Sequence, residues 1–468
     1  MQRNVADYQC LKAVLMHMEA NLRIRCAQRI PFIRSTEKLV PLKINNLTFE
    51  SFSTGINGTR YRLGVYREYH SGEVPKIIKK ENEEGGVQED LDQYGCQYES
   101  GFSVLLEGDV SFRSDNHQER EYLKHTNAHK RSLEWALELT ENALQIKLDL
   151  ESEGVTLEEY LARDYPFSLH PDDATKAGIL RCLSLTIDRL RDDVDKLRTE
   201  LLPFYYRRCK IPPPYTPYLQ LTITRDDRKE IHRFTYKKKL FEAEKQLRNI
   251  MFGDRRATIR VNEFEEFHEI DVYRLPIGFR IRANVLKVTG NRIPDKGLHS
   301  IFDILRFDTV ITFSLGNDIV EDFQNEIVKN AKTLIVTSYH MNPDELSLFL
   351  EESKNLEFHM KEFDLKYTAE GYYHILERWM ENIRPVGSIC TFEVKHSEEE
   401  TIRELLKLIR IRELHTKRSK RCVTVKLSDS DRLEVFYVPV KKSKFNDFMS
   451  DEDDHESKWC LKMRIVKI

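Results

Sequence analysis

Apolar residues near the start of the chain recur with helical spacing. Four of them stand at i, i+3, i+4 and i+7, which places them on one face of a helix: Leu11, Val14, Leu15 and Met18. Residues 27–42 add a second apolar surface that is punctuated by prolines. This pattern predicts a small helical module over residues 1–46.

Residues 47–117 show a different pattern. Short runs of strand-forming residues at 61–66 and 102–106 are separated by glycines, including the pair at 85–86. We therefore expect a small β-rich unit with tight turns.

Helical spacing returns in residues 118–280. Apolar residues from Leu180 to Leu201 alternate by three and four over roughly three heptads, and Pro203 is expected to end that helix. So short a seam favours packing within the chain over a dimeric coiled coil. A strand is expected at 219–224, followed by a helix that Gly253 closes. The prediction is a helical region with short strands.

From residue 281 the chain repeats a strand followed by a helix. The expected strands lie at 284–288, 310–315, 333–337, 362–366 and 390–395. Helical faces lie between them, and further strands are expected at 422–427, 433–438 and 459–466. The strand period of roughly 23–29 residues resembles that of leucine-rich repeats, although their leucine pattern is not kept. A doubly wound parallel sheet would give the same order of elements.

The expected fold is thus mixed α/β and multi-domain, ending in a degenerate leucine-rich-repeat-like βα solenoid over residues 281–468. Charged residues make up 32% of the chain, yet the formal net charge is only −3. This balance makes nucleic acid an unlikely partner, because binding phosphates by bulk charge needs an excess of Lys and Arg. The acidic run at 451–454 is expected to be a solvated loop.

Candidate chemistry is sparse. His125 and His129 share one helical face, but Thr126 stands where a zinc protease needs a glutamate. Asp90 and Asp92 lack the further ligands of a calcium loop. No phosphate-binding glycine motif and no nucleophile elbow is present. We predict no catalytic residues, no metal and no cofactor.

Two basic runs, at 237–239 and 417–421, are interpreted as solvated helix ends, although the second could also be a nuclear import signal or a phosphate contact. The eight cysteines are scattered without a C-x-x-C pair, which fits free thiols in a reducing compartment. Residues 1–18 lack the apolar core of a signal peptide, and no apolar run is long enough to span a membrane. These features favour the cytoplasm or nucleus.

Several stretches resemble a family that is expanded in nematodes, whose members share a domain of unknown function and some of which are called F-box C proteins. The stretches are YQCLKAVL (8–15), RIPFIRSTEK (29–38), YRLGVYREY (61–69), GGVQEDLDQYG (85–95), YLQLTIT (218–224), LFEAEK (240–245) and KWCLK (458–462).

The resemblance implies an F-box-like module that docks on the Skp adaptor of a ubiquitin ligase, with the remaining chain presenting an unknown protein substrate. Leu11, Val14, Leu15 and Met18 would face the adaptor. Gln9 stands where F-boxes usually have a proline step. The alternative is that this helix packs on the β-rich unit. The other functions considered are a binding scaffold without a ligase link, a self-associating structural protein, and an enzyme whose motif is not among the common ones.

Overall fold

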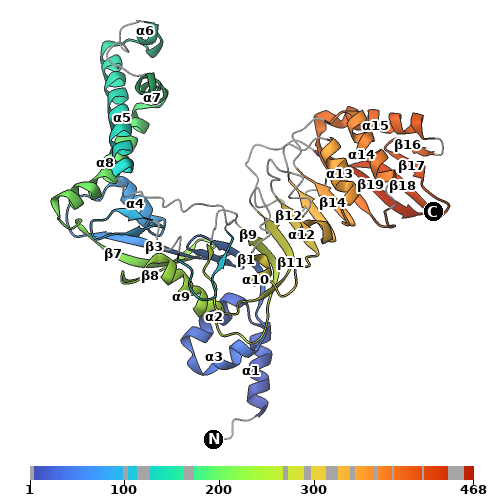
Figure 1. The fold of residues 1–468 in the computed structure, drawn as a ribbon, viewed down its shortest axis with the longest axis horizontal. Coiled ribbons are helices and arrows are strands. Elements are labelled where there is room, and N and C mark those ends of the chain that lie inside the picture. Colours follow the sequence, from blue (N-terminus) through green and yellow to red (C-terminus); the bar gives the residue numbers. More distant parts are fainter. Residues whose placement is uncertain are drawn as a thin grey trace.

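One sheet of fifteen strands runs through the protein, as the computed structural model shows (Figure 1). The structure describes residues 5–98, 104–112, 127–162, 173–266, 272–288, 297–312, 325–337, 343–361, 367–381, 384–413, 416–440 and 458–468. The strand order is β16-β17-β18-β19-β15-β14-β13-β12-β11-β9-β1-β2-β3-β7-β8. The mixed α/β class is therefore confirmed.

The strands have the following bounds: β1 Lys43–Glu50, β2 Ser53–Ile56, β3 Thr59–Tyr69, β4 Asp90–Leu91, β5 Gln97–Tyr98, β6 Val110–Ser111, β7 Tyr215–Arg225, β8 Arg228–Thr235, β9 Ile259–Glu266, β10 Val272–Tyr273, β11 Ile281–Val288, β12 Thr309–Thr312, β13 Thr333–Val336, β14 Glu357–Met360, β15 Ile389–Lys395, β16 Thr416–Ser419, β17 Cys422–Lys426, β18 Asp431–Pro439 and β19 Lys458–Lys467. The helices have these bounds: α1 Val5–His17, α2 Ala20–Arg29, α3 Pro31–Leu39, α4 Lys76–Glu83, α5 Asn127–Glu153, α6 Leu157–Ala162, α7 Asp173–Leu183, α8 Ile187–Cys209, α9 Leu240–Phe252, α10 Leu298–Ile301, α12 Glu326–Asn330, α13 Pro343–Glu352, α14 Ala369–Glu381 and α15 Glu399–Arg412.

The strands β9 and β11 to β15 are parallel and lie side by side in chain order, whereas β10 pairs with β6 in a separate two-stranded sheet. Register partners Val285, Thr309, Thr333 and Glu357 are each 24 residues apart. A doubly wound sheet reverses its strand order at a switch point. No such reversal occurs between β9 and β15, so that alternative does not describe these strands.

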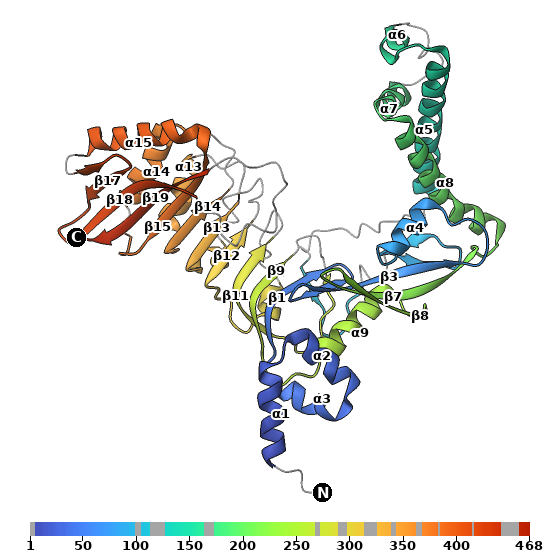
Figure 2. The ribbon, with the colours of Figure 1, turned by 180° about the vertical axis from the view of Figure 1, so that it is seen from behind.

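Buried positions in the repeats recur at i, i+3 and i+5. Phe307, Val310 and Thr312 form one such set, and the sets at 331, 334, 336 and at 355, 358, 360 are equally buried. The apolar side chains of these sets belong, with apolar residues of α13, α14 and α15, to one continuous core. The spacing places two inward residues on each strand and one just before it, so the helices cover one face of the sheet (Figure 2).

The C-terminal strands extend the sheet in antiparallel fashion. β19 inserts between β15 and β18, and β17 and β16 follow. The three expected strands of the tail are confirmed. The basic run at 417–421 lies on the β16–β17 hairpin and not at a helix end, contrary to the prediction.

The N-terminal part of the sheet joins the same architecture through β1. β1 pairs in parallel with β9 and antiparallel with β2, and β3, β7 and β8 complete a meander. The predicted domain boundary after residue 46 falls inside β1, and the boundary at residue 280 falls directly before β11.

A helical arm, α5 to α8, projects from the β3–β7 end of the sheet (Figure 1). The expected heptad helix is two helices, because Thr186 accepts a hydrogen bond from the N–H of Arg189 and starts α8 afresh. Pro203 lies inside α8 and does not end it, contrary to the prediction. A cluster that includes Leu139, Leu183 and Leu190 joins α5 to α7 and α8, so the apolar faces of these helices pack against one another within the chain.

Other local predictions differ from the structure. The fourth repeat strand is Glu357–Met360, earlier than the expected 362–366, and residues 104–106 form no strand. α9 is closed by Gly253 as expected. Some predicted positions lie outside the described residues: Phe102, Ser103, His125, the segments 313–315 and 362–366, and the acidic run 451–454.

Candidate functional site

The N-terminal helices α1, α2 and α3 form a three-helix unit, called the head here. Of the four predicted adaptor-facing residues, Leu15 is completely buried, and Leu11 and Met18 pack partly buried against its cluster. Ile33 of α3 shares this cluster, so the apolar face of α1 packs within the head rather than on the meander. Val14 alone of the four is largely exposed, at 56%.

A buried arginine holds the head together. The Arg23 guanidinium is 2.7 Å from Glu37 Oε1 and donates to the carbonyls of Leu15, Val40 and Pro41. Burial lowers the pKa of Arg23, and the adjacent Glu37 carboxylate opposes this effect. These bonds fix α1 and the end of α3 to α2.

The head is also fixed to the sheet. Asn21 of α2 donates to the carbonyl of Ile56 at 2.9 Å, and its Oδ1 accepts from the Tyr61 hydroxyl at 3.0 Å. Burial raises the pKa of Tyr61 to about 12, so the phenol stays neutral. Glu19 accepts from Leu22 N–H and from Asn57, which ties the start of α2 to the β2–β3 turn. The orientation of the head is therefore set by buried polar contacts.

Large apolar side chains nevertheless remain exposed on every helix of the head. Phe32 is 68% exposed and Leu22 is 51% exposed, and the others are Val14, Met16, Ile30 and Leu39. Each of these positions lies outside the head's own core, so its side chain is available to a partner.

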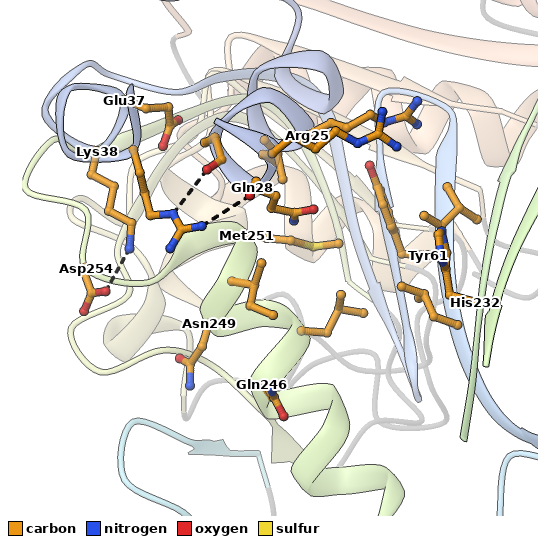
Figure 3. Close-up of a pocket in the computed structure, with 18 of the residues that line it drawn as sticks. Arg25, Gln28, Glu37, Lys38, Tyr61, His232, Gln246, Asn249, Met251 and Asp254 are labelled. Carbon is orange, nitrogen blue, oxygen red and sulfur yellow. Dashed lines mark hydrogen bonds and ion pairs between the residues drawn. The ribbon is translucent and has the colours of Figure 1, made fainter. Parts of the chain in front are cut away.

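A groove of about 710 Å³ lies between the head and the meander (Figure 3). Its walls come from α2, α3 and α9, and its floor from Tyr61 of β3, Leu221 and Ile223 of β7, and Phe234 of β8. This volume is in the range of ligand-binding cavities. The groove combines a partly apolar floor with charged walls.

Cations outnumber carboxylates in the groove. The cations are Arg25, Arg29, Arg34, Lys38 and Arg255, and the carboxylates are Glu37, Glu230 and Asp254. Arg25 and Arg29 both approach Glu230, but only at 3.8 and 4.0 Å. Figure 3 shows Arg25 beside Tyr61 and His232, and the Lys38–Asp254 pair at the other end.

Arg255 is the most buried of these cations. Its side chain is 5% exposed, Nη1 is 2.8 Å from Glu37 Oε1, and Nη2 donates to the Met251 carbonyl. No hydrogen-bond partner for its Nε lies among the described residues.

The strand β8 bounds the groove on its open side. β8 is the last strand of the sheet and pairs only with β7 among the described strands. Glu230, His232 and Phe234 alternate along it toward the groove, and Phe234 is 53% exposed. An unpaired strand edge presents backbone N–H and C=O groups that an added strand can bind.

The other sequence candidates have structural roles. Asp90 is buried and accepts from the Tyr236 hydroxyl and the Leu240 N–H at the start of α9. Asp92 binds Arg207 of α8 at 2.6 Å. Within the described ranges, no three His, Cys, Asp or Glu side chains gather closely enough to hold a metal ion. All eight cysteines are free thiols.

A second buried ionic cluster braces α9. The carboxylate of Asp109 contacts Lys245 at 2.7 Å and Arg274 at 2.6 Å, and all three side chains are almost fully buried. Arg248, on the same helix, donates to the β1–β2 turn and lies over the Phe49 ring at 4.5 Å. This cluster positions the α9 wall of the groove.

No local pattern in the sequence indicated the groove, because its residues come from six elements that are spread over residues 24–255. The single local sign was the basic composition of residues 23–29, which fits a solvated helix equally well.

Comparison with known proteins matches one family model, "Domain of unknown function (DUF3557)", over residues 239–396. This segment begins at α9 and includes the parallel strands β9 to β15. No curated protein and no solved structure is detectably similar to the chain. No helix among the described residues is both long and apolar enough to cross a membrane.

Proposed function

We propose that the protein is a non-enzymatic interaction protein, and specifically an F-box-like substrate-recognition subunit of a ubiquitin ligase. The observation that supports this most is the head, a three-helix unit whose exposed apolar side chains lie outside its own core. An exposed set of this kind is typical of a docking surface. The resemblance of residues 8–38 to F-box C proteins indicates a Skp adaptor as the occupant.

The adaptor-facing residues in this proposal differ from those expected from the sequence. Leu15 serves the core of the head, and Leu11 and Met18 pack beside it. Val14 is kept from the expected set, and Leu22 and Phe32 join it, because the side chains of all three reach solvent.

The parallel strands would present the substrate-facing surface. Their inward spacing of i, i+3 and i+5 matches the first three leucine positions of a leucine-rich repeat, with other residue types in place of leucine. The face away from the helices carries half-buried residues such as Ile311, Ile335 and His359. Such stacked repeats offer an extended binding surface. A scaffold that uses this face without a ligase is the alternative.

Co-purification with a recombinant Skp adaptor tests the proposal. Full-length protein is expected to retain the adaptor, and Phe32→Asp is expected to reduce retention by about tenfold or more, since an interface anchor is replaced by a charge. Leu348→Asp is the matched control, because Leu348 is 62% exposed on α13, outside the head. Absence of adaptor binding by folded wild-type protein would refute the ligase role and leave the scaffold.

A further inference from the structure

We infer that the groove between the head and the meander binds an extended acidic segment of a partner protein, which adds as a strand to the free edge of β8. This inference goes beyond adaptor docking and does not depend on it. It follows from the position of β8 and the charge of the groove.

The edge of β8 supplies the backbone partner. All side chains from Ile231 to Thr235 are exposed, and β8 is the last strand of the sheet among the described strands. A strand added there would place every second side chain on the groove side, beside His232 and Phe234. Apolar residues of the segment would cover Phe234, which is half exposed.

The charge of the groove selects an acidic segment. Arg25 and Arg29 project from α2 toward Glu230 of β8 and share this one carboxylate at the limit of ion-pair distance. A carboxylate side chain on the groove side of an added strand would meet Arg25 and Arg29.

Two anionic polymers would respond to these cations, a protein segment and a nucleic acid strand. The unpaired strand edge and the apolar floor favour the protein segment, because nucleic acid has no backbone that can continue a β-sheet. Aromatic stacking platforms for bases are also sparse, since Tyr61 is buried and only Phe234 is exposed among the aromatic residues that line the groove.

Fluorescence anisotropy of a labelled twelve-residue peptide tests the inference with full-length protein and no adaptor. The peptide has three repeats of Glu-Thr-Val-Thr, which place Glu and Val in turn on one face of a strand. It is expected to bind saturably, and a peptide with Lys in place of Glu about tenfold more weakly or not at all. The double variant R25E/R29E is expected to weaken binding by about tenfold. The control R189E/K196E makes the same charge change on the exposed face of α8 and is expected to stay within about twofold.

Two further measurements separate strand addition from general charge attraction. Peptides N-methylated at the Glu and Val positions or at the Thr positions are expected to differ by about tenfold, because only alternate N–H groups of an added strand face β8. Phe234→Ser is expected to weaken binding without a change of net charge. Equal affinity of the two N-methylated peptides, an equal loss in both charge variants, or tighter binding of a ten-nucleotide single strand would each overturn the inference.

Discussion

Glu266 tests how burial on the inward face of the sheet affects the stability of the protein. It occupies the position of Phe49 on β1 and Val288 on β11, and its side chain is buried. Burial raises the pKa of Glu266 from an ordinary value of 4.5 to about 7. The folded protein therefore holds this proton more tightly than the unfolded chain does.

The sign of the pH dependence follows from this difference. Below pH 4.5 the carboxyl is protonated in both the folded and the unfolded state, so folding does not bury a charged group. As the pH rises from 4.5 to about 7, the unfolded chain releases the proton first, and stability is lost. One pKa unit corresponds to 1.36 kcal/mol, so the full loss above pH 7 is about 3 kcal/mol.

Glu266→Gln removes this titration and keeps the shape of the side chain. We expect the variant to be up to about 3 kcal/mol more stable than the wild type at pH 8, and about equally stable at pH 4. Urea denaturation at both pH values measures the difference, in which all other titrating groups cancel.

The neighbour Glu265 provides the control for this prediction. Its carboxylate is on the opposite side of the strand and lies 2.7 Å from Lys287. Glu265→Gln is expected to be neutral or slightly destabilising at pH 8, by up to about 1 kcal/mol. The reasoning about Glu266 is refuted if Glu266→Gln lowers stability at pH 8, or shifts it equally at both pH values.

Three other substitutions test the polar contacts and close packing that position the groove, and thermal or urea unfolding measures each. Glu37→Gln removes the carboxylate between two buried arginines and is expected to lower the free energy of unfolding by about 3–5 kcal/mol. The control Lys38→Gln breaks a pair with a 90% exposed carboxylate and is expected to lower it by at most about 1 kcal/mol. Similar losses in the two variants would contradict the role of burial. Asp109→Ala removes the carboxylate shared by two buried cations, with an expected loss of about 3–5 kcal/mol that a near-neutral result would contradict. Gly86→Ala is expected to cost more than about 1 kcal/mol, because φ is +91° and an added Cβ would lie 2.7 Å from the backbone of β3; a stability gain would contradict this packing.

The sequence predicted elements well where one face is buried and the apolar period is regular. α9, α15 and the tail strands were found because their buried residues keep a period of 3.6 or 2. β8 was missed because it is an edge strand exposed along nearly its whole length, so no face of it needs apolar residues. β9 was missed because charged and polar residues fill its outward positions and its last inward position is a glutamate, Glu266.

The repeat was recognised by its length, but its pattern was hidden by residue type. The leucine pattern typical of such repeats is absent, because the protein fills the same inward spacing with residues as different as Ala331, Phe307 and Asn355. Asn355 is tolerated there because its amide donates to the carbonyls of Val328 and Ala331 in the preceding repeat. A buried position in a stacked repeat requires a side chain that fits the available space and whose polar groups form hydrogen bonds, and more than one residue type meets this requirement.

The two proposed surfaces share the head, and this limits how they can work together. α2 contributes Arg25 and Arg29 to the groove, while Leu22 on the same helix is exposed to solvent. Because Arg23 and Asn21 fix α2 to the rest of the head and to the β2–β3 hairpin, the helix cannot turn without breaking buried hydrogen bonds. A segment captured in the groove would therefore lie at a set distance from an adaptor on the head. A ligase subunit needs such geometry to hold its substrate in one place.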